Sequence, residues 1–419
     1  MLLGCIADDF TGATDLANML VRGGMRTIQT IGVPSATFGQ DVDAIVVALK
    51  SRTIDPSDAV AQSLAALDGL KRAGCAQFYL KYCSTFDSTP KGNIGPVTDA
   101  LMNALQTDFT VACPAFPEAG RTIFRGYLFV GDILLSESGM KDHPLTPMSD
   151  ANLVRVLQPQ TRSKVGLLRY DVLAQGPDRV REAIAVLRQR GVGIAIVDAL
   201  GQSDLDCLAE ACANLPLVTA GSGLGLAIAN HRRRAGFLPN AATAARLPQV
   251  KGNAAILSGS CSQATNQQVA HWMRSRPALR VDPLRLANGQ PVVEQALAWA
   301  QGCLQAGPVL IYATSTPQEV KIVQRELGVE RAGLLIEGAL AEIGKGLVRA
   351  GVRKIVVAGG ETSGAVVGAL GIRSLRIGPQ IDPGVPWTES LDAEPLALAL
   401  KSGNFGSPDF FSKALAQLE

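Results

Sequence analysis

The chain has 419 residues, which exceeds one ordinary hydrophobic core and predicts about two domains. Its 39 basic and 37 acidic residues are mixed along the chain, which argues against a nucleic-acid partner. Hydrophobic residues make up 47% and glycine occurs 43 times, a composition typical of α/β enzymes with many strand–helix turns. The short basic run 232–234 is expected to be a solvated helix end.

Cysteine usage and hydropathy indicate a cytoplasmic protein. None of the eight cysteines has a Cys-x-x-Cys partner, and most lie in apolar runs. We therefore expect reduced, mostly buried thiols rather than disulfides or zinc ligands. No apolar run approaches the roughly 18 residues of a spanning helix, and the N-terminus lacks a signal-peptide pattern. Neither a membrane partner nor export is expected.

Short β-rich runs alternate with longer amphipathic stretches along the whole chain. In Ala13–Arg22, apolar residues recur on one helical face. This alternation predicts an α/β fold in which each domain is a mostly parallel sheet flanked by helices. The expected strands are Leu2–Ala7, Ala44–Leu49, Phe78–Tyr82, Phe109–Cys113, Gly193–Val197, Leu217–Thr219, Ala254–Leu257, Val309–Ala313 and Lys354–Ala358.

A break in this alternation marks the domain boundary. The stretch Phe237–Gly252 contains prolines and glycine but no sustained periodicity. It predicts an N-terminal domain over 1–240, a linker over 241–252 and a C-terminal domain over 253–419. The longest irregular segment is expected at Thr122–Asp150.

The first candidate site follows the first expected strand. There Asp8 and Asp9 precede Thr11 and Gly12, which open a helix. Because ligands bind beyond the carboxyl ends of parallel strands, either aspartate suits proton acceptance from a hydroxyl or metal binding. No lysine or arginine beside the pair accounts for it as an ion pair. The alternative is that Asp9 or Thr11 only caps the helix.

A second polar segment follows the strand that ends near Tyr82. It combines lysines, hydroxyls, an aspartate and an asparagine, groups that suit the carboxylate and hydroxyls of a sugar acid. An ordinary hydrophilic turn is the alternative. The expected substrate-binding residues are Lys81, Ser84, Thr85, Ser88, Lys91, Gly92 and Asn93, and Asp87 is a further catalytic candidate.

A third segment lies near the C-terminus, where glycines directly follow the strand Lys354–Ala358. A glycine-rich turn before a helix lets backbone N–H groups approach phosphate, and hydroxyls add donors. The residues concerned are Gly360, Glu361, Thr362 and Ser363.

Two other glycine patterns partly resemble nucleotide-binding motifs. Gly221–Gly225 reads GxGxG rather than GxGxxG and lacks the acidic residue about 20 positions on, so an NAD(P)-dependent sugar-acid dehydrogenase is only an alternative. Gly338–Lys345 misses the phosphate-loop spacing and is expected to be amphipathic helix.

Several of these segments together make the chain resemble the four-carbon acid sugar kinase family. The likeness covers essentially the whole chain, through Ala7–Ala13, Pro114–Arg121, His143–Met148 and Gly359–Gly364. The amino-acid sequence of Lys81–Asn93 is most similar to that of the 3-oxo-tetronate kinase branch. Threonate and erythronate kinases, the alternative, typically have a shorter loop with arginine where this chain has Lys91.

The resemblance implies what each domain does. It implies an N-terminal sugar-acid domain and a C-terminal nucleotide domain that face an active-site cleft, with ATP phosphorylating the 4-hydroxyl of 3-oxo-tetronate. ATP contacts are implied at Ser258, Gly360–Ser363 and Gly403. Mg²⁺ is expected with ATP, though its protein ligands are unknown, and Asp9 is preferred over Asp8 as the catalytic base. A homodimer is an alternative to a monomer, and a binding protein without turnover is an alternative to a kinase.

Overall fold

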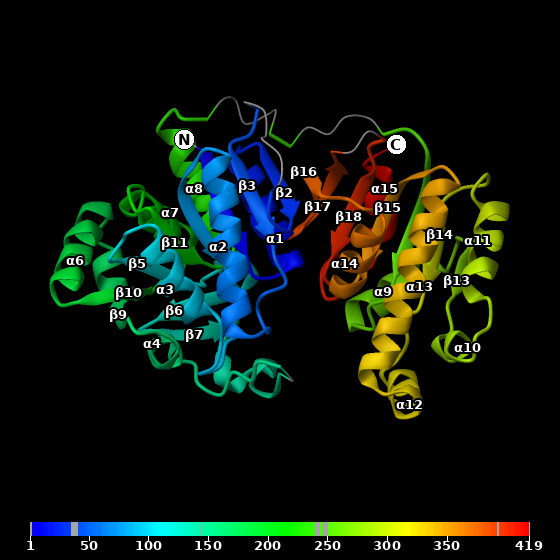
Figure 1. The fold of residues 1–419 in the computed structure, drawn as a ribbon, viewed down its shortest axis with the longest axis horizontal. Coiled ribbons are helices and arrows are strands. Elements are labelled where there is room, and N and C mark those ends of the chain that lie inside the picture. The colour runs from blue at the N-terminus through cyan, green and yellow to red at the C-terminus, as the bar shows by residue number, and fades with distance from the viewer. Residues whose placement is uncertain are drawn as a thin grey trace. The chain divides into compact units, whose positions relative to one another are not determined.

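The computed structural model describes residues 2–34, 41–143, 145–238, 244–245, 250–391 and 394–418. The chain forms two compact units, Met1–Ala245 and Arg246–Glu419. The linker predicted at 241–252 lies largely outside the described residues. Each unit contains a mostly parallel sheet with helices on both faces (Figure 1), so the predicted fold class is confirmed.

The sheet of the first unit is parallel throughout, in the order β2-β3-β1-β4-β11-β5-β10-β9. Its strands are almost entirely buried, which explains their apolar runs without polar alternation. They are β1 (Leu2–Ala7), β2 (Thr27–Ile31), β3 (Ala44–Ala48), β4 (Cys75–Lys81), β5 (Thr110–Cys113), β9 (Lys164–Leu168), β10 (Val192–Val197) and β11 (Leu217–Ala220).

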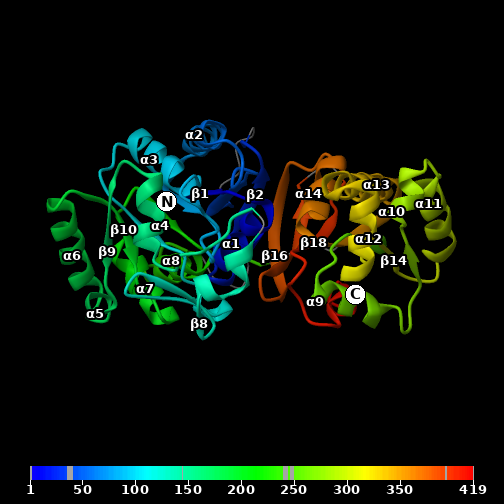
Figure 2. The same cartoon turned by 90° about the horizontal axis from the view of Figure 1, so that it is seen from below.

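Helices cover both faces of this sheet. In Figure 2, α2 and α3 lie on one side, and α7 and α8 lie on the other, where α8 also packs against α1. The helices are α1 (Phe10–Arg22), α2 (Pro56–Arg72), α3 (Ile94–Ala104), α4 (Leu153–Leu157), α5 (Tyr170–Leu173), α6 (Pro177–Gln189), α7 (Gln202–Ala211) and α8 (Gly223–Arg234).

The segment expected to be irregular, Thr122–Asp150, is largely structured. It forms most of a small antiparallel sheet of β6 (Arg121–Phe124), β7 (Tyr127–Val130) and β8 (Ile133–Leu134), followed by two short 3₁₀ turns. The expectation was wrong because Gly126 and Gly131 adopt positive φ at the two tight turns, so these glycines connect strands instead of ending regular structure.

The second unit has the strand order β13-β14-β12-β15-β18-β17-β16, in which β17 runs antiparallel to both β18 and β16 and the other neighbouring strands are parallel. The strands are β12 (Asn253–Ser258), β13 (Ala278–Arg280), β14 (Val309–Tyr312), β15 (Val352–Ala358), β16 (Ser374–Asp382), β17 (Val385–Ser390) and β18 (Ala397–Lys401).

The helices of the second unit also lie on both faces of its sheet. Helices α13 and α14 pack together on one face, and α9 and α15 pack together on the other (Figure 2). The helices are α9 (Gln263–Trp272), α10 (Pro283–Ala287), α11 (Val292–Cys303), α12 (Pro317–Leu327), α13 (Val329–Arg349), α14 (Gly360–Ala369) and α15 (Phe410–Ala416). Trp272, Trp387, Phe410 and Phe411 form the aromatic part of the core beneath α9 and α15.

All eight cysteines are free, as predicted. Among the residues that the structure describes, none of the helices is long and apolar enough to cross a bilayer.

Candidate functional site

Three carboxylates of the first unit meet at one arginine. Strands β3, β1 and β4 are adjacent and parallel, so the residues after them, Arg52, Asp8, Asp9 and Asp87, meet at one edge of the sheet. Arg52 Nε lies 2.9 Å from Asp8 Oδ2, and Nη2 lies 2.8 Å from Asp8 Oδ1. Arg52 also bonds Asp9, and its Nη1 lies 3.5 Å from Asp87 Oδ2.

The expectation that no cation accounts for the aspartate pair is therefore wrong. Arg52 is far from Asp8 and Asp9 in sequence, and the strand pairing brings it to them. Burial alone would lower the pKa of Arg52, but the charge of Asp8, with smaller effects from Cys83 and Asp87, raises it above its usual value. The guanidinium thus stays charged and joins three loops.

Asp9 also caps helix α1. Its backbone is extended, and Oδ1 accepts hydrogen bonds from the Gly12 N–H and from Thr11 Oγ1, the latter at 3.1 Å. Asp9 is therefore the N-cap of α1, but capping is not its only interaction. Its other carboxylate oxygen meets Arg52, so this side chain connects the helix start to the charged cluster.

Lys81 approaches the same helix start from β4. Its side chain is only 3% exposed, and a Cβ placed on Gly12 would lie 2.8 Å from Lys81 Nζ and 3.0 Å from the Asp9 carboxylate oxygens. Glycine at position 12 is what allows this close approach. The ion pairs of Asp8, Asp9 and Asp87 go to Arg52, and none in the described part of the chain goes to Lys81. A buried ammonium without a direct ion pair suits an anionic ligand.

The loop after β4 holds Asp87 in a constrained conformation. Phe86 and Asp87 both have positive φ, at 66° and 34°, which is uncommon for residues with side chains. Thr85 Oγ1 donates to Asp87 Oδ1 at 2.6 Å and so fixes the carboxylate toward Arg52. Such strain is characteristic of functional sites.

Other predicted acid-binding residues support the loops around Arg52. Asn93 Nδ2 donates to the carbonyls of Ser51 at 2.8 Å and Ile54 at 2.9 Å, so it holds the segment that carries Arg52. Ser88 is buried and donates to Gln160 at 3.1 Å. The cavity at this sheet edge is small, about 20 Å³, and its polar lining residues include Asp8, Ser51, Arg52, Lys81, Asp87, Ser88 and Asn93. Thr85 is buried, Ser84 and Gly92 are half-buried, and Lys91 is exposed.

Two residues of this region escaped the sequence reasoning. Arg52 had a recognisable signal, because Ser51 and Arg52 follow a buried strand just as the aspartates do. Asp15 of α1 is half-buried, and it accepts a hydrogen bond from Ser222. Burial raises the pKa of Asp15, although the nearby Lys81 acts in the opposite direction.

In the second unit, three adjacent parallel strands again end at one edge of the sheet, but the loops that follow them are rich in glycine instead of charged side chains. Strands β12, β15 and β18 are adjacent and parallel, and glycine-containing loops follow all three. The loops border a cavity of about 250 Å³ that also contacts α13. Its lining consists of Gly259, Ser260, Gly333, Ile336, Glu337, Gly359, Gly360, Glu361, Thr362 and Gly403. Four of the six residues implied for ATP thus lie on one cavity.

Close packing between the loops requires two of these glycines. Gly359 has φ +128°, and a Cβ there would lie 3.2 Å from the Ser260 nitrogen. A Cβ on Gly403 would lie 2.2 Å from Ser260 Oγ. The three loops therefore form one surface of backbone and hydroxyl groups, beside the first turn of α14, which suits phosphate.

The two remaining residues implied for ATP, Ser258 and Ser363, lie beneath this surface. Both are fully buried. Ser258 Oγ hydrogen-bonds Thr314 Oγ1 at 2.7 Å. Ser363 Oγ has no hydrogen-bond partner among the described residues. Only Ser258 thus makes a side-chain hydrogen bond to another loop, and neither serine is among the residues that line the cavity.

Lys401 is a further residue that sequence reasoning missed. It ends β18, two positions before Gly403, and is fully buried. Its Nζ donates to Thr265 Oγ1 at 3.0 Å and to the Gly403 carbonyl at 3.1 Å. Burial lowers the pKa of Lys401 to about 7. The apolar strand around it gave no reason to expect a functional lysine.

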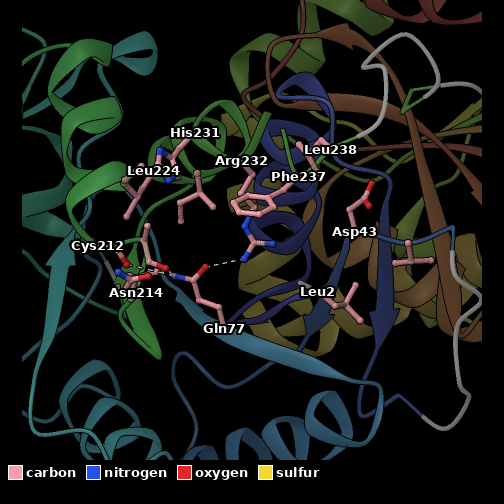
Figure 3. Close-up of a pocket in the computed structure, with 15 residues that line it drawn as sticks. Leu2, Asp43, Gln77, Cys212, Asn214, Leu224, His231, Arg232, Phe237 and Leu238 are labelled. Carbon is pink, nitrogen blue, oxygen red and sulfur yellow. Dashed lines mark hydrogen bonds between the residues drawn. The ribbon is translucent and has the colours of Figure 1, made fainter. Parts of the chain in front are cut away.

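A larger cavity of about 480 Å³ lies at the opposite, amino-terminal edge of the first sheet. Figure 3 shows Leu2, the first residue of β1, beside Gln77 of β4 and Arg232 of α8. Arg232 is buried and donates to Gln77 at 2.8 Å, so it is not the solvated helix end expected for 232–234. This cavity includes none of the predicted site residues.

The two glycine patterns that partly resemble nucleotide-binding motifs have structural explanations. A Cβ on Gly221 would lie 2.8 Å from the Pro114 carbonyl, and one on Gly223 would lie 2.7 Å from the Ala115 carbonyl. The glycines between β11 and α8 are therefore needed for backbone packing. Gly338–Lys345 lies inside α13, as predicted.

Both units match known protein families. Residues 3–228 match the family described as a sugar-binding N-terminal domain, and residues 255–411 match the nucleotide-binding C-terminal domain. The chain belongs to the family of proteins that join these two domains.

Curated relatives give a more particular comparison. A protein from Burkholderia multivorans named 3-oxo-tetronate kinase is 66% identical over all of this chain and 97% of its own length. Another 3-oxo-tetronate kinase, from Pseudomonas fluorescens, is 67% identical with the same coverage. The predicted resemblance to four-carbon acid sugar kinases is thus confirmed.

Solved structures share the whole fold. A crystal structure of a Haemophilus influenzae protein is 47% identical, covers 99% of this chain and 100% of its own, and superposes with a TM-score of 0.86. A Salmonella typhimurium protein is 45% identical, covers 100% of this chain and 99% of its own, and has a TM-score of 0.92.

The cavity of the second unit yields a direct prediction. Gly360→Val places a branched side chain where phosphate would approach the start of α14, and should weaken binding of a non-hydrolysable ATP analogue by more than about tenfold. Titration calorimetry on the folded variant measures this. Gly364→Val is the matched control, because it lies in the same helix and a Cβ there meets open space. If Gly360→Val bound the ATP analogue as tightly as Gly364→Val does, this loop would not be part of the nucleotide site.

Proposed function

We propose that this chain is an ATP-dependent kinase that phosphorylates the 4-hydroxyl of 3-oxo-tetronate, yielding 3-oxo-tetronate 4-phosphate and ADP. The observation that carries the proposal is the meeting of Lys81, Arg52 and three aspartates at one sheet edge. This site offers cations for a carboxylate and acceptors for hydroxyls. The glycine-rich cavity of the second unit and the names of the full-length relatives support the same activity.

The proposed roles follow from burial and charge. Lys81 binds the substrate carboxylate, because it is buried and has no ion pair among the described residues. Asp8 and Asp87 accept hydrogen bonds from substrate hydroxyls, with Arg52 fixing their orientation. Asn93 and Thr85 hold the loops that carry Arg52 and Asp87.

Asp9 is the proposed catalytic base. It accepts the proton of the 4-hydroxyl while that oxygen bonds the terminal phosphorus of ATP and the bond from phosphorus to ADP breaks. The start of α1 and Lys81 stabilise negative charge beside it. Because phosphoryl transfer depends mainly on positioning and charge neutralisation, turnover requires the two ligand sites to meet.

Mg²⁺ is proposed to bind together with ATP. Glu337 and Glu361 are among the residues that line the nucleotide cavity. Carboxylate oxygens are ligands that suit Mg²⁺. The ion would neutralise phosphate charge when bound. Free cysteines and the need for ATP support a cytoplasmic location.

The proposed activity is tested by an ADP-release assay on the purified chain. We expect ADP release with 3-oxo-tetronate to exceed that with threonate or erythronate by at least about tenfold in kcat/KM. A preference for threonate or erythronate would instead assign the chain to the threonate and erythronate kinases. ADP release with none of the acids would contradict the kinase proposal.

Acid binding is tested with a pair of lysine variants. Lys81→Met removes the buried charge and should raise KM for the acid by about tenfold or more, since hydrogen bonds to charged groups contribute about 1.5–3 kcal/mol. Lys91→Met makes the same change on an exposed side chain and should have a smaller effect. A larger effect at Lys91 would reverse the two roles, and a change in the KM for ATP alone would assign the acid to another site.

The catalytic role of Asp9 can be separated from its capping role. Asp9→Asn keeps a good N-cap but removes the charge, so kcat should fall at least about 100-fold while Tm stays near that of the wild type. Asp9→Ala should also lose about 0.5–2 kcal/mol of stability. Normal turnover in the asparagine variant would leave Asp9 as a cap only, and Asp87→Asn would then be measured for the loss.

A further inference from the structure

The nucleotide cavity lacks a positive charge on its surface. None of its described lining residues is lysine or arginine, whereas Glu337 and Glu361 are both acidic. Nucleotide phosphates carry several negative charges, and sites for them usually supply a cation. A candidate for this cation lies at the end of β18, beneath the residues that line the cavity.

Lys401 is that candidate. Its ammonium donates to the carbonyl of Gly403, a cavity-lining residue, and to Thr265 near the start of α9. Both partners are neutral oxygens. The side chain is fully buried, and no carboxylate in the described part of the chain forms an ion pair with it. A charged amine in this position is costly unless an anion compensates it.

The charged groups on the surrounding elements do not provide that compensation. Asp382 pairs with Lys413, and Lys354 donates to the Leu418 carbonyl. Burial alone accounts for the lowered pKa of Lys401. The titratable residues on the elements packed around β18 are Cys261 before α9, His271 of α9, Arg353 and Lys354 of β15, Glu361 of α14, Arg376 and Asp382 of β16, Glu389 of β17, Asp409 before α15 and Lys413 of α15.

We propose that Lys401 is a buried counter-charge for the nucleotide phosphates, and that nucleotide binding is coupled to uptake of a proton by this amine. The inference rests on the nucleotide site proposed above and adds a linkage between pH and affinity. The empty site favours the neutral amine, because charge there is buried without a partner. Phosphate in the cavity supplies the missing anion and favours the ammonium.

The affinity for nucleotide should depend on pH through the protonation of Lys401. Below about pH 7 Lys401 is already protonated in the empty protein, so binding carries no protonation cost. Above pH 7 the empty protein loses the proton, and nucleotide must restore it. Affinity should therefore fall as pH rises from 7 to 9, with a limiting slope of about tenfold per pH unit.

Titration calorimetry of the full chain with Mg²⁺–ADP at pH 8 tests the coupling. At this pH the phosphates are fully ionised, so comparing Tris with HEPES, which differ in ionisation enthalpy, counts protons taken up by the protein. We expect uptake of about half a proton or more per nucleotide. Lys401→Met should abolish the uptake, weaken binding at pH 7 by about tenfold, and flatten the pH dependence.

Two further variants make the result decisive. Lys354→Met is the matched control on the neighbouring strand, and it should retain proton uptake. Lys401→Arg keeps a permanent charge, so it should bind nucleotide without uptake and remain insensitive to pH, even if the methionine variant folds poorly. Nucleotide binding by the wild type without proton uptake, or uptake that persists in Lys401→Met, would overturn this inference. Failure of the wild type to bind nucleotide at all would instead contradict the proposed function.

Discussion

The charged cluster around Arg52 is the constraint on which the first unit's site depends. A single guanidinium meets carboxylates from the loops after β1 and β4, while its own loop follows β3. The ion pairs of Arg52 thus connect three chain segments that are distant in sequence. Loss of the cation would leave like charges adjacent in a partly buried place, which is far more unfavourable than the loss of a surface ion pair. The amide of Asn93 and the cap at Asp9 then fix the two sides of this cluster.

The same backbone geometry serves different chemistry in the two units. In each unit three adjacent parallel strands end together, and the loops that follow them create a site. The first unit fills this edge with charged side chains, which suits an acid with hydroxyls. The second unit presents backbone and hydroxyl groups above a buried lysine, which suits phosphates. Sheet topology therefore determines where each ligand can bind, and loop composition determines which ligand it is.

Sequence reasoning recovered the strand–helix alternation and most positions of the candidate site, because both leave local signals. Leu2–Ala7 is an uninterrupted apolar run, and the aspartates and glycines directly follow such runs. Arg52 and Lys401 were missed since their importance arises from partners brought together only by strand order. Ser258 and Ser363 show the opposite case, in which a local motif was found but the direction of its side chains was not readable from spacing.

The position of β18 within its sheet has a consequence for the order of events during synthesis. This strand is among the last segments of the chain, yet it lies between β15 and β17 in the interior of its sheet. Residues of the first unit leave the ribosome early and contain all of their own strands, so that unit can form a complete core while translation continues. The second unit cannot complete its sheet until β18 has been synthesised, and Gly403, which lines the nucleotide cavity, follows β18. The nucleotide cavity therefore forms only after the chain of the first unit is already able to fold.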